Sequence, residues 1–330
     1  MIVSILEQGA TIRAVAGRCR IEKRGALLRE IPLEQIREYQ IIGGVQITTN
    51  ALRDALARNI SVHFLTTHGK YLGRIQPNAT SFTDLLRHQV RRTDDPQFTL
   101  GIAKAIVRGK LENTRVVLQQ YARDKKSDLA QAASLFQTQV LERLQDAHDL
   151  DYLRGLEGVA AQAHFAALGE LLPSGFPEFP GRRRRPPTDP LNAMLSYGYA
   201  LLLTRVQTAV QLAGLHPGFG FLHVSHGARP ALALDLMEEY RSALIDRFAL
   251  GLLSRNRMGM EHFEVRKTAV LLNETGRSKF IAYFNQRLSQ TITAPDGTTK
   301  SYEQLFAHQA RHMASCLRYS NPNYQPLRVR

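Results

Sequence analysis

The chain has 330 residues, and 43 Lys and Arg against 29 Asp and Glu give it a formal net charge of +14. A length of this order favours two domains, and 44% hydrophobic against 22% charged residues excludes disorder as the main state. The positive surplus makes nucleic acid and anionic membranes the first partners to consider. Apolar runs such as residues 200–203 and 248–253 are far shorter than the roughly 18 residues of a membrane-spanning helix. This pattern argues against a chain that crosses a bilayer.

Residues 1–80 are typical of a small β-rich domain. They contain short segments with β-branched residues, namely IVSIL, TIRAVAG, VQITT and SVHFL, separated by glycines. One helix is expected at residues 50–58, with Asn50 as its N-cap. The first segment has Glu7 inside its only apolar stretch and no basic region before it, so it does not resemble a secretory signal. The two cysteines lie at opposite ends of the chain and form no disulfide framework, so we expect a cytoplasmic protein.

After a linker at residues 81–90, residues 91–330 are expected to form a larger helical domain. Stretches rich in Ala, Leu, Gln and Arg predict long helices at residues 99–123, 128–153, 156–171, 191–213 and 232–253. The expected fold class is therefore α+β, with an N-terminal domain that resembles a β-sandwich followed by a larger all-α domain.

A loop rich in proline and arginine interrupts the helices at residues 173–190. It holds six of the 14 prolines, which remove helix and sheet donors and predict an extended conformation. It also holds four arginines in a row, Arg182, Arg183, Arg184 and Arg185. Two interpretations stay open: a flexible arm that binds phosphate, or a charged run that only solvates the loop.

Several common catalytic motifs are missing. The sequence contains no GxxxxGK[ST] and no HExxH, which argues against a P-loop nucleotidase and a zincin protease. His308, His312 and Cys316 recur at four-residue spacing and could share one helical face as zinc ligands. Because no fourth ligand is evident, packing roles are favoured for these three.

The most informative stretch is residues 216–241, HPGFGFLHVSHGARPALALDLMEEYR. An irregular segment delivers His223, and a helix that starts near Pro230 places Asp235 and Glu238 three residues apart on one face. Carboxylate oxygens bind Mg²⁺ or Mn²⁺, and an imidazole ligand favours Mn²⁺. The alternatives are an exposed Asp235, a Glu238 that pairs with Arg241 on a solvated helix face, and a hydrogen-bonded turn histidine.

A second helix presents Glu157 in the segment LRGLEGVAAQAHFAAL. Gly155 and Gly158 are small neighbours that would allow another helix or a backbone segment to approach Glu157 closely. His164 lies seven residues on and could share its face as a rival ligand. Spacing alone does not show that Glu157 meets the carboxylates of the other helix.

Five segments resemble a known family in this order: YLGRIQP, IVRGKLENTRVVL, GLEGVAAQAHF, LNAMLSYGYALL and GFLHVSHGARPALALDLMEEYR. The chain is similar over nearly its whole length to the CRISPR-associated adaptation integrases, the larger protein of the spacer-acquisition machinery. The family's metal ligands fall on Glu157, His223 and Glu238, with Asp235 as a nearby acidic position that assists.

The resemblance implies a Mg²⁺- or Mn²⁺-dependent DNA endonuclease and integrase that inserts spacer DNA into a CRISPR array by transesterification. It also implies that residues 1–80 serve dimerisation and DNA contact and that residues 91–330 form the catalytic domain. The implied partners are double-stranded DNA, namely spacer precursor and array, a second copy of the chain, and a small companion adaptation protein in a heterohexamer. Two alternatives stay open: a basic DNA-binding scaffold or regulator without catalysis, and a dimerising module whose charge serves solubility alone.

Basic residues outside the site are expected to hold DNA by its phosphates. The candidates are Lys110, Arg115, Arg182, Arg183, Arg184, Arg185, Arg255, Arg257 and the terminal Arg328 and Arg330.

Overall fold

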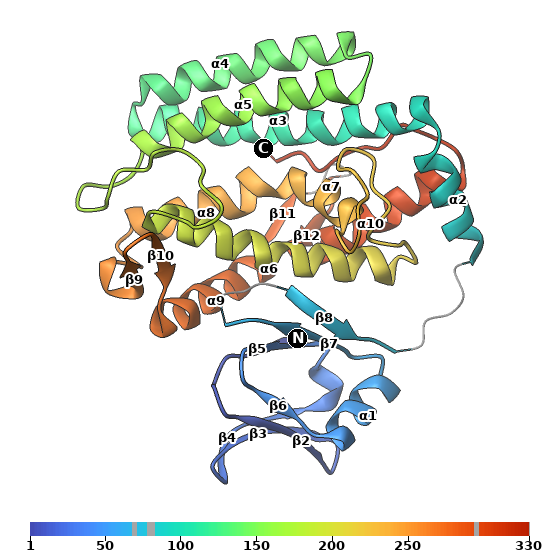
Figure 1. Ribbon diagram of the computed structural model, residues 1–330, viewed down its shortest axis with the longest axis vertical. Helices are drawn as coiled ribbons and strands as arrows, with labels where there is room; N and C mark the ends of the chain where they lie inside the picture. The colour runs from blue at the N-terminus through green and yellow to red at the C-terminus, as the bar shows by residue number, and fades with distance from the viewer. Residues whose placement is uncertain (68–70, 78–82, 294–296, 330) are drawn as a thin grey trace. The chain divides into compact units, whose positions relative to one another are not determined.

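The computed structural model describes residues 1–67, 71–77, 83–293 and 297–329, and the chain divides into two compact units, Met1–Ser81 and Phe82–Arg330 (Figure 1). The prediction of a linker at residues 81–90 is wrong for residues 83–90, because Thr83–Thr93 form helix α2. Asp84 in its first turn and Arg91 and Arg92 in its last turn match the helix dipole, and Leu85 is buried. Ser81 lies outside the described residues.

The N-terminal unit contains two four-stranded sheets. One sheet has the order β1-β5-β7-β8, in which β1 and β7 run parallel to β5 and β8 runs antiparallel to β7. The other has the order β4-β3-β2-β6, in which β3 is antiparallel to both neighbours and β6 is parallel to β2. The bounds are β1 Ile2–Ile5, β2 Thr11–Val15, β3 Arg18–Lys23, β4 Ala26–Pro32, β5 Glu38–Ile42, β6 Gln46–Ile47, β7 Ser61–Leu65 and β8 Tyr71–Ile75.

Both sheets contribute apolar side chains to one core. Ile12 and Ile21 of one sheet and Val3 and Ile41 of the other belong to the same buried cluster, together with Ala55 of helix α1 (Thr49–Ala57). Burial of both inner faces gives the expected sandwich-like arrangement. A 3₁₀ turn, Leu33–Gln35, precedes β5.

The expected N-cap of α1 is wrong by two residues. Thr48 caps the helix, because its hydroxyl accepts a hydrogen bond from the Ala51 N–H at 3.3 Å, and Asn50 already lies inside the helix.

The second unit is mostly helical, which confirms the α+β class. Its helices are α2, α3 Pro96–Lys125, α4 Asp128–Arg143, α5 Leu150–Glu170, α6 Pro190–Leu212, α7 Ala231–Tyr240, α8 Arg247–Ser254, α9 Glu274–Ser289 and α10 Tyr302–Arg318, with a π-helix at Arg241–Asp246 and 3₁₀ turns at Leu144–Asp146 and Met260–His262. The expectation of an all-α domain needs correction, because two short hairpins occur: β9 Phe263–Arg266 with β10 Ala269–Leu272, and β11 Thr291–Thr293 with β12 Thr299–Ser301.

The single helix expected at residues 128–153 is two helices. Helix α4 ends at Arg143, and the chain turns through buried Leu144 and Ala147 before α5 begins. Asp149 starts α5 because its carboxylate accepts a hydrogen bond from the Tyr152 N–H at 2.7 Å. This break lets α4 and α5 fold back and pack against each other and against α3 (Figure 1).

Helix α3 is central, since it contacts α4, α5, α7 and the π-helix. The C-terminal tail also packs on it: the Asn113 side-chain amide donates hydrogen bonds of 2.8 Å to the backbone oxygens of Glu239 and Leu327. Gly109 makes room for the tail, because a Cβ there would lie 2.4 Å from Pro326 Cβ. Within the described part of the chain, no helix is both long and apolar enough to cross a membrane.

Candidate active site

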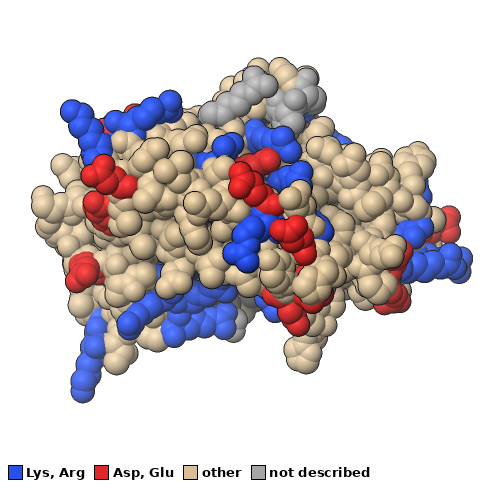
Figure 2. Space-filling model, turned by 90° about the horizontal axis from the view of Figure 1, so that it is seen from above, with Lys and Arg blue, Asp and Glu red and all other residues tan. Residues whose placement is uncertain are grey.

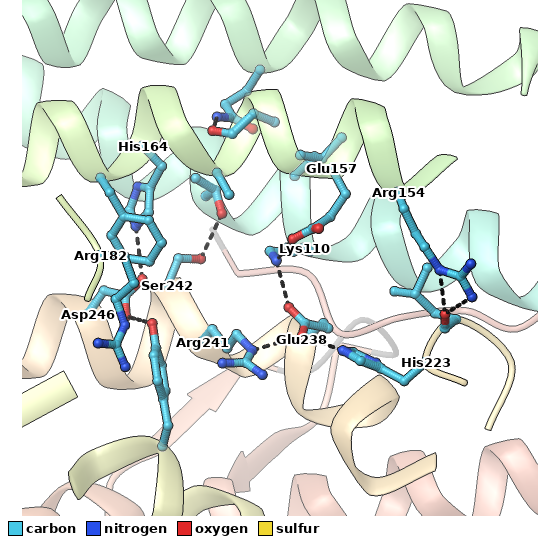
Figure 3. A pocket seen from close by; sticks show the side chains of 18 of the residues that line it. Lys110, Arg154, Glu157, His164, Arg182, His223, Glu238, Arg241, Ser242 and Asp246 are labelled. Atoms are coloured by element: carbon cyan, nitrogen blue, oxygen red, sulfur yellow. Dashed lines mark hydrogen bonds and ion pairs between the residues drawn. The ribbon is translucent and has the colours of Figure 1, made fainter. Parts of the chain in front are cut away.

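A pocket of about 420 Å³ opens in the helical unit between α3, α5, the loop before α7, and the π-helix. Lys110 of α3, Glu157 of α5, His223 of the loop and Glu238 of α7 line it, together with Arg241 at the start of the π-helix (Figure 3). Three regions that are far apart in the sequence, α3, α5 and residues 223–241, therefore bring charged groups to one place.

The ammonium of Lys110 bridges the two glutamates. It donates a hydrogen bond to Glu157 Oε1 and lies 2.7 Å from Glu238 Oε2 (Figure 3). Arg241 Nε lies 2.9 Å from the other oxygen, Glu238 Oε1. Each oxygen of Glu238 therefore faces a cation, Oε2 the Lys110 ammonium and Oε1 the Arg241 guanidinium.

Neighbouring charges keep Glu238 and Lys110 ionised in spite of their burial. Burial by itself raises the pKa of Glu238, but Arg241, Lys110 and His223 outweigh it and lower that pKa to about 2. Burial by itself lowers the pKa of Lys110, but Glu238 and Glu157 raise it above its ordinary value. At neutral pH the pocket therefore holds an ionised Glu238 next to two cations.

Asp235 anchors the loop that carries His223. Its fully buried carboxylate accepts backbone N–H hydrogen bonds from Phe221 at 2.6 Å, Leu222 at 3.1 Å and His223 at 2.9 Å. It also lies 2.7 Å from His223 Nδ1, which leaves Nε2 directed at Glu238 Oε1, 3.8 Å away. The loop approaches this carboxylate closely at Gly220, where a Cβ would lie 2.8 Å from Asp235 Oδ2.

A second buried polar cluster borders the pocket at the end of the π-helix. Asp246 accepts a hydrogen bond from the Tyr199 hydroxyl and lies 2.8 Å from His164 Nε2. The Arg241 guanidinium lies over the Tyr199 ring at 4.6 Å and that of Arg182 at 5.3 Å. These contacts hold Arg241 in place between Tyr199 and Glu238.

The sequence analysis named Arg241 only as a partner of Glu238 on a solvated face and missed Asp246, although Arg241 ends the DLMEEYR segment and Asp246 follows shortly after it. The expected spacing is that of an α-helix, whereas Arg241–Asp246 form a π-helix whose extra residue per turn changes which side chains face the pocket. His164 pairs with Asp246 and not with the group of Glu157.

The structure brings Glu157, His223 and Glu238 to the same pocket, with Asp235 directly behind His223. The alternative pairing of Glu238 with Arg241 also exists, but both side chains are buried and not on a solvated face. The interpretation of Gly155 and Gly158 as contact points is wrong, because no atom lies within 4 Å of a Cβ added at either position.

No group of three or more His, Cys, Asp and Glu among the residues that the structure describes has its side chains arranged around one metal position. In this pocket Lys110 lies between the two glutamates. The His308, His312 and Cys316 series has packing contacts instead: His312 Nε2 accepts a hydrogen bond from the Gln325 N–H at 3.0 Å, its ring stacks on Tyr324, and Cys316 is buried.

The expected DNA-binding residues occupy different environments. Lys110 points into the pocket, Arg115 is half-buried, and Arg328 pairs with Glu112 at 2.7 Å, while Arg330 lies outside the described residues. Arg255 and Arg257 are exposed and line a second pocket of about 440 Å³ together with Arg247 and Arg287. In Figure 2, blue Lys and Arg side chains gather at the lower left of the view, whereas blue and red side chains are interspersed elsewhere on this face.

The arginines of the loop at residues 173–190 do not act as one run. Arg182 is held by hydrogen bonds to Asn192 Oδ1 at 2.7 Å and Ser196 Oγ at 3.1 Å, and it lines the first pocket with Arg184. Arg183 and Arg185 are exposed. The loop is irregular, as its prolines predict, but Phe179 and Arg182 anchor it to the helices.

Known proteins resemble this chain over most of its length. Residues 3–286 match the family model described as CRISPR associated protein Cas1. A CRISPR-associated endonuclease Cas1 from Thermus thermophilus is 37% identical over 318 residues, covering 96% of each chain.

Solved structures have the same fold. A Cas6-RT-Cas1–Cas2 complex matches 99% of this chain and 36% of its own chain with a TM-score of 0.83 and 24% identity. A casposase bound to an integration product matches 97% of this chain and 90% of its own with a TM-score of 0.84 and 22% identity. The resemblance seen in the sequence is thereby confirmed, and the chain belongs to the Cas1 family of CRISPR-associated proteins.

Proposed function

We propose that this protein is a metal-dependent DNA endonuclease and integrase that inserts spacer DNA into a CRISPR array by phosphodiester transesterification. One observation carries the proposal: Glu157 and Glu238, from helices far apart in the sequence, share one cation in a pocket that His223 also lines. The endonuclease relative and the casposase bound to an integration product support the reaction class.

The donor set fits a divalent ion. Two carboxylates and one imidazole are ligands that Mg²⁺ or Mn²⁺ accepts, and oxygens of Glu157 and Glu238 already face one common cation, the Lys110 ammonium. Glu157, His223 and Glu238 would hold the ion, which when bound supplies Lewis acidity toward a phosphodiester.

The chain's own residues prepare the pocket for DNA. Asp235 holds the His223 ring by Nδ1, so that Nε2 faces Glu238. Arg182, Arg184 and Arg229 also line the pocket and would attract a phosphate without reading the base sequence.

We also propose double-stranded DNA, a second copy of this chain, and a small companion adaptation protein in a heterohexamer as partners. The net charge of +14 supports DNA, and the Cas1–Cas2 complex among the structural neighbours supports the companion.

Two cysteines that are buried and free support a reducing compartment, for which we propose the cytoplasm.

The test is nicking and integration on supercoiled plasmid with Mg²⁺ or Mn²⁺. Glu157→Ala, His223→Ala and Glu238→Ala should abolish strand joining and nicking, while DNA binding persists. Glu264→Ala is the matched control, because this carboxylate pairs with Arg266 on the exposed surface. Salt-dependent DNA binding without any metal-dependent joining by the parent would favour the scaffold alternative, and full activity of all three variants would disprove the ligand assignment.

A further inference from the structure

We infer that Lys110 holds the cation position between Glu157 and Glu238 until a DNA phosphate draws its ammonium away, so that DNA and the divalent ion bind this pocket cooperatively. This inference rests on the proposed function. It concerns the role of a lysine that the sequence assigns only to a DNA-holding surface.

The first support is the position of the ammonium. Lys110 contacts carboxylates from two separate helices, and its side chain is 15% exposed, so it is enclosed but not sealed. The charged and titratable groups that face it are Glu157 from α5, Glu238 and His223 from α7 and its loop, and Arg241 from the π-helix. A divalent ion held by Glu157 and Glu238 would compete with Lys110 for the same oxygens.

The second support is the charge balance. Glu157 and Glu238 carry two negative charges, which Lys110 and Arg241 already neutralise. Entry of a divalent ion would leave a surplus of two positive charges in a pocket that other arginines also line. One of the two cations must therefore withdraw from the carboxylates.

Lys110 is the cation that can move. Arg241 is fixed from two sides, since its guanidinium lies 4.6 Å from the centre of the Tyr199 ring and its Nε 2.9 Å from Glu238. The Lys110 ammonium has no aromatic partner among the described residues and sits on a four-carbon stem that changes rotamer readily. When the Lys110 ammonium withdraws from the carboxylates, its positive charge remains in a partly buried site and needs a new anion as its partner.

A backbone phosphate of DNA meets that need. The nearest acidic residue along α3, Glu112, is already paired with Arg328. When phosphate accepts the ammonium, the carboxylates are released for the ion, and when the ion occupies the carboxylates, Lys110 is released for phosphate. Each ligand therefore favours the other, and the coupling is reciprocal.

The test is the Kd for Mn²⁺, measured from the electron paramagnetic resonance signal of free Mn²⁺ with and without a short DNA duplex, corrected for binding to DNA alone. In the parent protein, DNA should tighten Mn²⁺ binding by about 5- to 150-fold, the usual range of coupling between two sites. Lys110→Gln and Lys110→Met should bind Mn²⁺ tightly without DNA and lose most of this coupling. Lys104→Gln is the matched control on the same helix, because Lys104 is half-buried, does not line this pocket, and donates a hydrogen bond to the Gln145 backbone oxygen at 3.1 Å.

Three outcomes would overturn the inference. Parental Mn²⁺ affinity of both Lys110 variants without DNA would show that the lysine does not compete. Parental coupling in those variants would show that phosphate acts on the ion directly, and an equal shift in Lys104→Gln would show an effect of overall charge. If Glu238→Ala abolishes Mn²⁺ binding while the Lys110 variants behave as the parent, only this inference fails. If the parent itself does not bind Mn²⁺, the proposed function fails with it.

Discussion

Asp235 is the residue whose role the structure makes most testable, because one substitution separates anchoring from metal binding. Each carboxylate oxygen serves two donors: Oδ2 accepts from the Phe221 and Leu222 N–H groups, and Oδ1 accepts from the His223 N–H and contacts Nδ1 of the same residue. In Asp235→Asn, one oxygen becomes an amide that donates hydrogen bonds. The two donor groups that contacted that oxygen then face the N–H₂ donor of the new amide in a fully buried site.

The size of the effect follows from the hydrogen bonds that the substitution removes. A hydrogen bond to a charged group contributes about 1.5–3 kcal/mol, so the loss of two such bonds costs about 3–6 kcal/mol of unfolding free energy. That is a large fraction of the 5–15 kcal/mol by which a typical domain is stable. When the amide nitrogen takes the place of Oδ1, the His223 ring also loses the acceptor that orients it, and loss of such a partner typically weakens metal binding by about 10- to 100-fold.

Urea unfolding monitored by circular dichroism measures the stability loss, and titration with Mn²⁺ measures the affinity. Asp151→Asn is the matched control, since this carboxylate is 92% exposed and should change stability by no more than about 0.5 kcal/mol. A loss below about 1 kcal/mol in Asp235→Asn, with parental Mn²⁺ affinity, would refute the anchoring role.

Three further predictions concern the tail, a buried acid and the second pocket. Gly109→Ala should cost about 1–3 kcal/mol in urea unfolding because the added methyl group would lie 2.4 Å from the C-terminal tail, whereas Gly155→Ala should gain up to about 1 kcal/mol in open space. Burial raises the pKa of Glu239 from 4.5 to about 7, so its stabilising contribution of about 2–3 kcal/mol is present near pH 5 and lost by pH 8. Glu239→Gln should remove this pH dependence from unfolding free energies. Arg255→Gln with Arg257→Gln should lower the slope of log affinity against log salt for duplex DNA by up to about 1.8.

Each of these predictions has an opposing result. Equal effects of the two glycine substitutions would contradict the packing of the tail on α3. An unchanged pH dependence in Glu239→Gln would show that another group titrates. Arg266→Gln is the control for the second pocket, because Arg266 already pairs with Glu264 at 2.9 Å, and an equal loss of salt slope there would assign the effect to net charge.

The sequence predicts the elements whose signals are local. Long apolar segments are sufficient for α3 and α6, because α3 buries one face from Phe98 to Leu118 and α6 is buried over most of its length. The prediction of a single helix at residues 128–153 is wrong because the break between α4 and α5 depends on Asp149, which caps α5. In the sequence, an aspartate at this position is equally typical of an exposed residue inside a helix. The hairpins β9–β10 and β11–β12 are too short for alternation to distinguish them from loops.

For the site, the sequence predicts residue types but not which groups meet. His223, Asp235 and Glu238 lie within one segment, so helical spacing alone relates the two acids. Glu157 joins them only through the packing of α5 on α3, which no spacing reveals. The sequence places Lys110 among the surface cations, because the rotation of α3 that turns it inward depends on the tail and on α7.

The inward position of Lys110 also shows how part of the positive charge of the chain acts inside the pocket and not on the surface. If all the surplus cations faced solvent, the carboxylates of the pocket would repel each other and raise their own pKa values until one bound a proton. Lys110 and Arg241 prevent this, and the low pKa of Glu238 is the direct result. Glu238 therefore stays ionised without a metal, and a divalent ion bound as proposed would not have to displace a proton from it. It would have to displace Lys110, and the pocket would retain that lysine for the phosphate that follows.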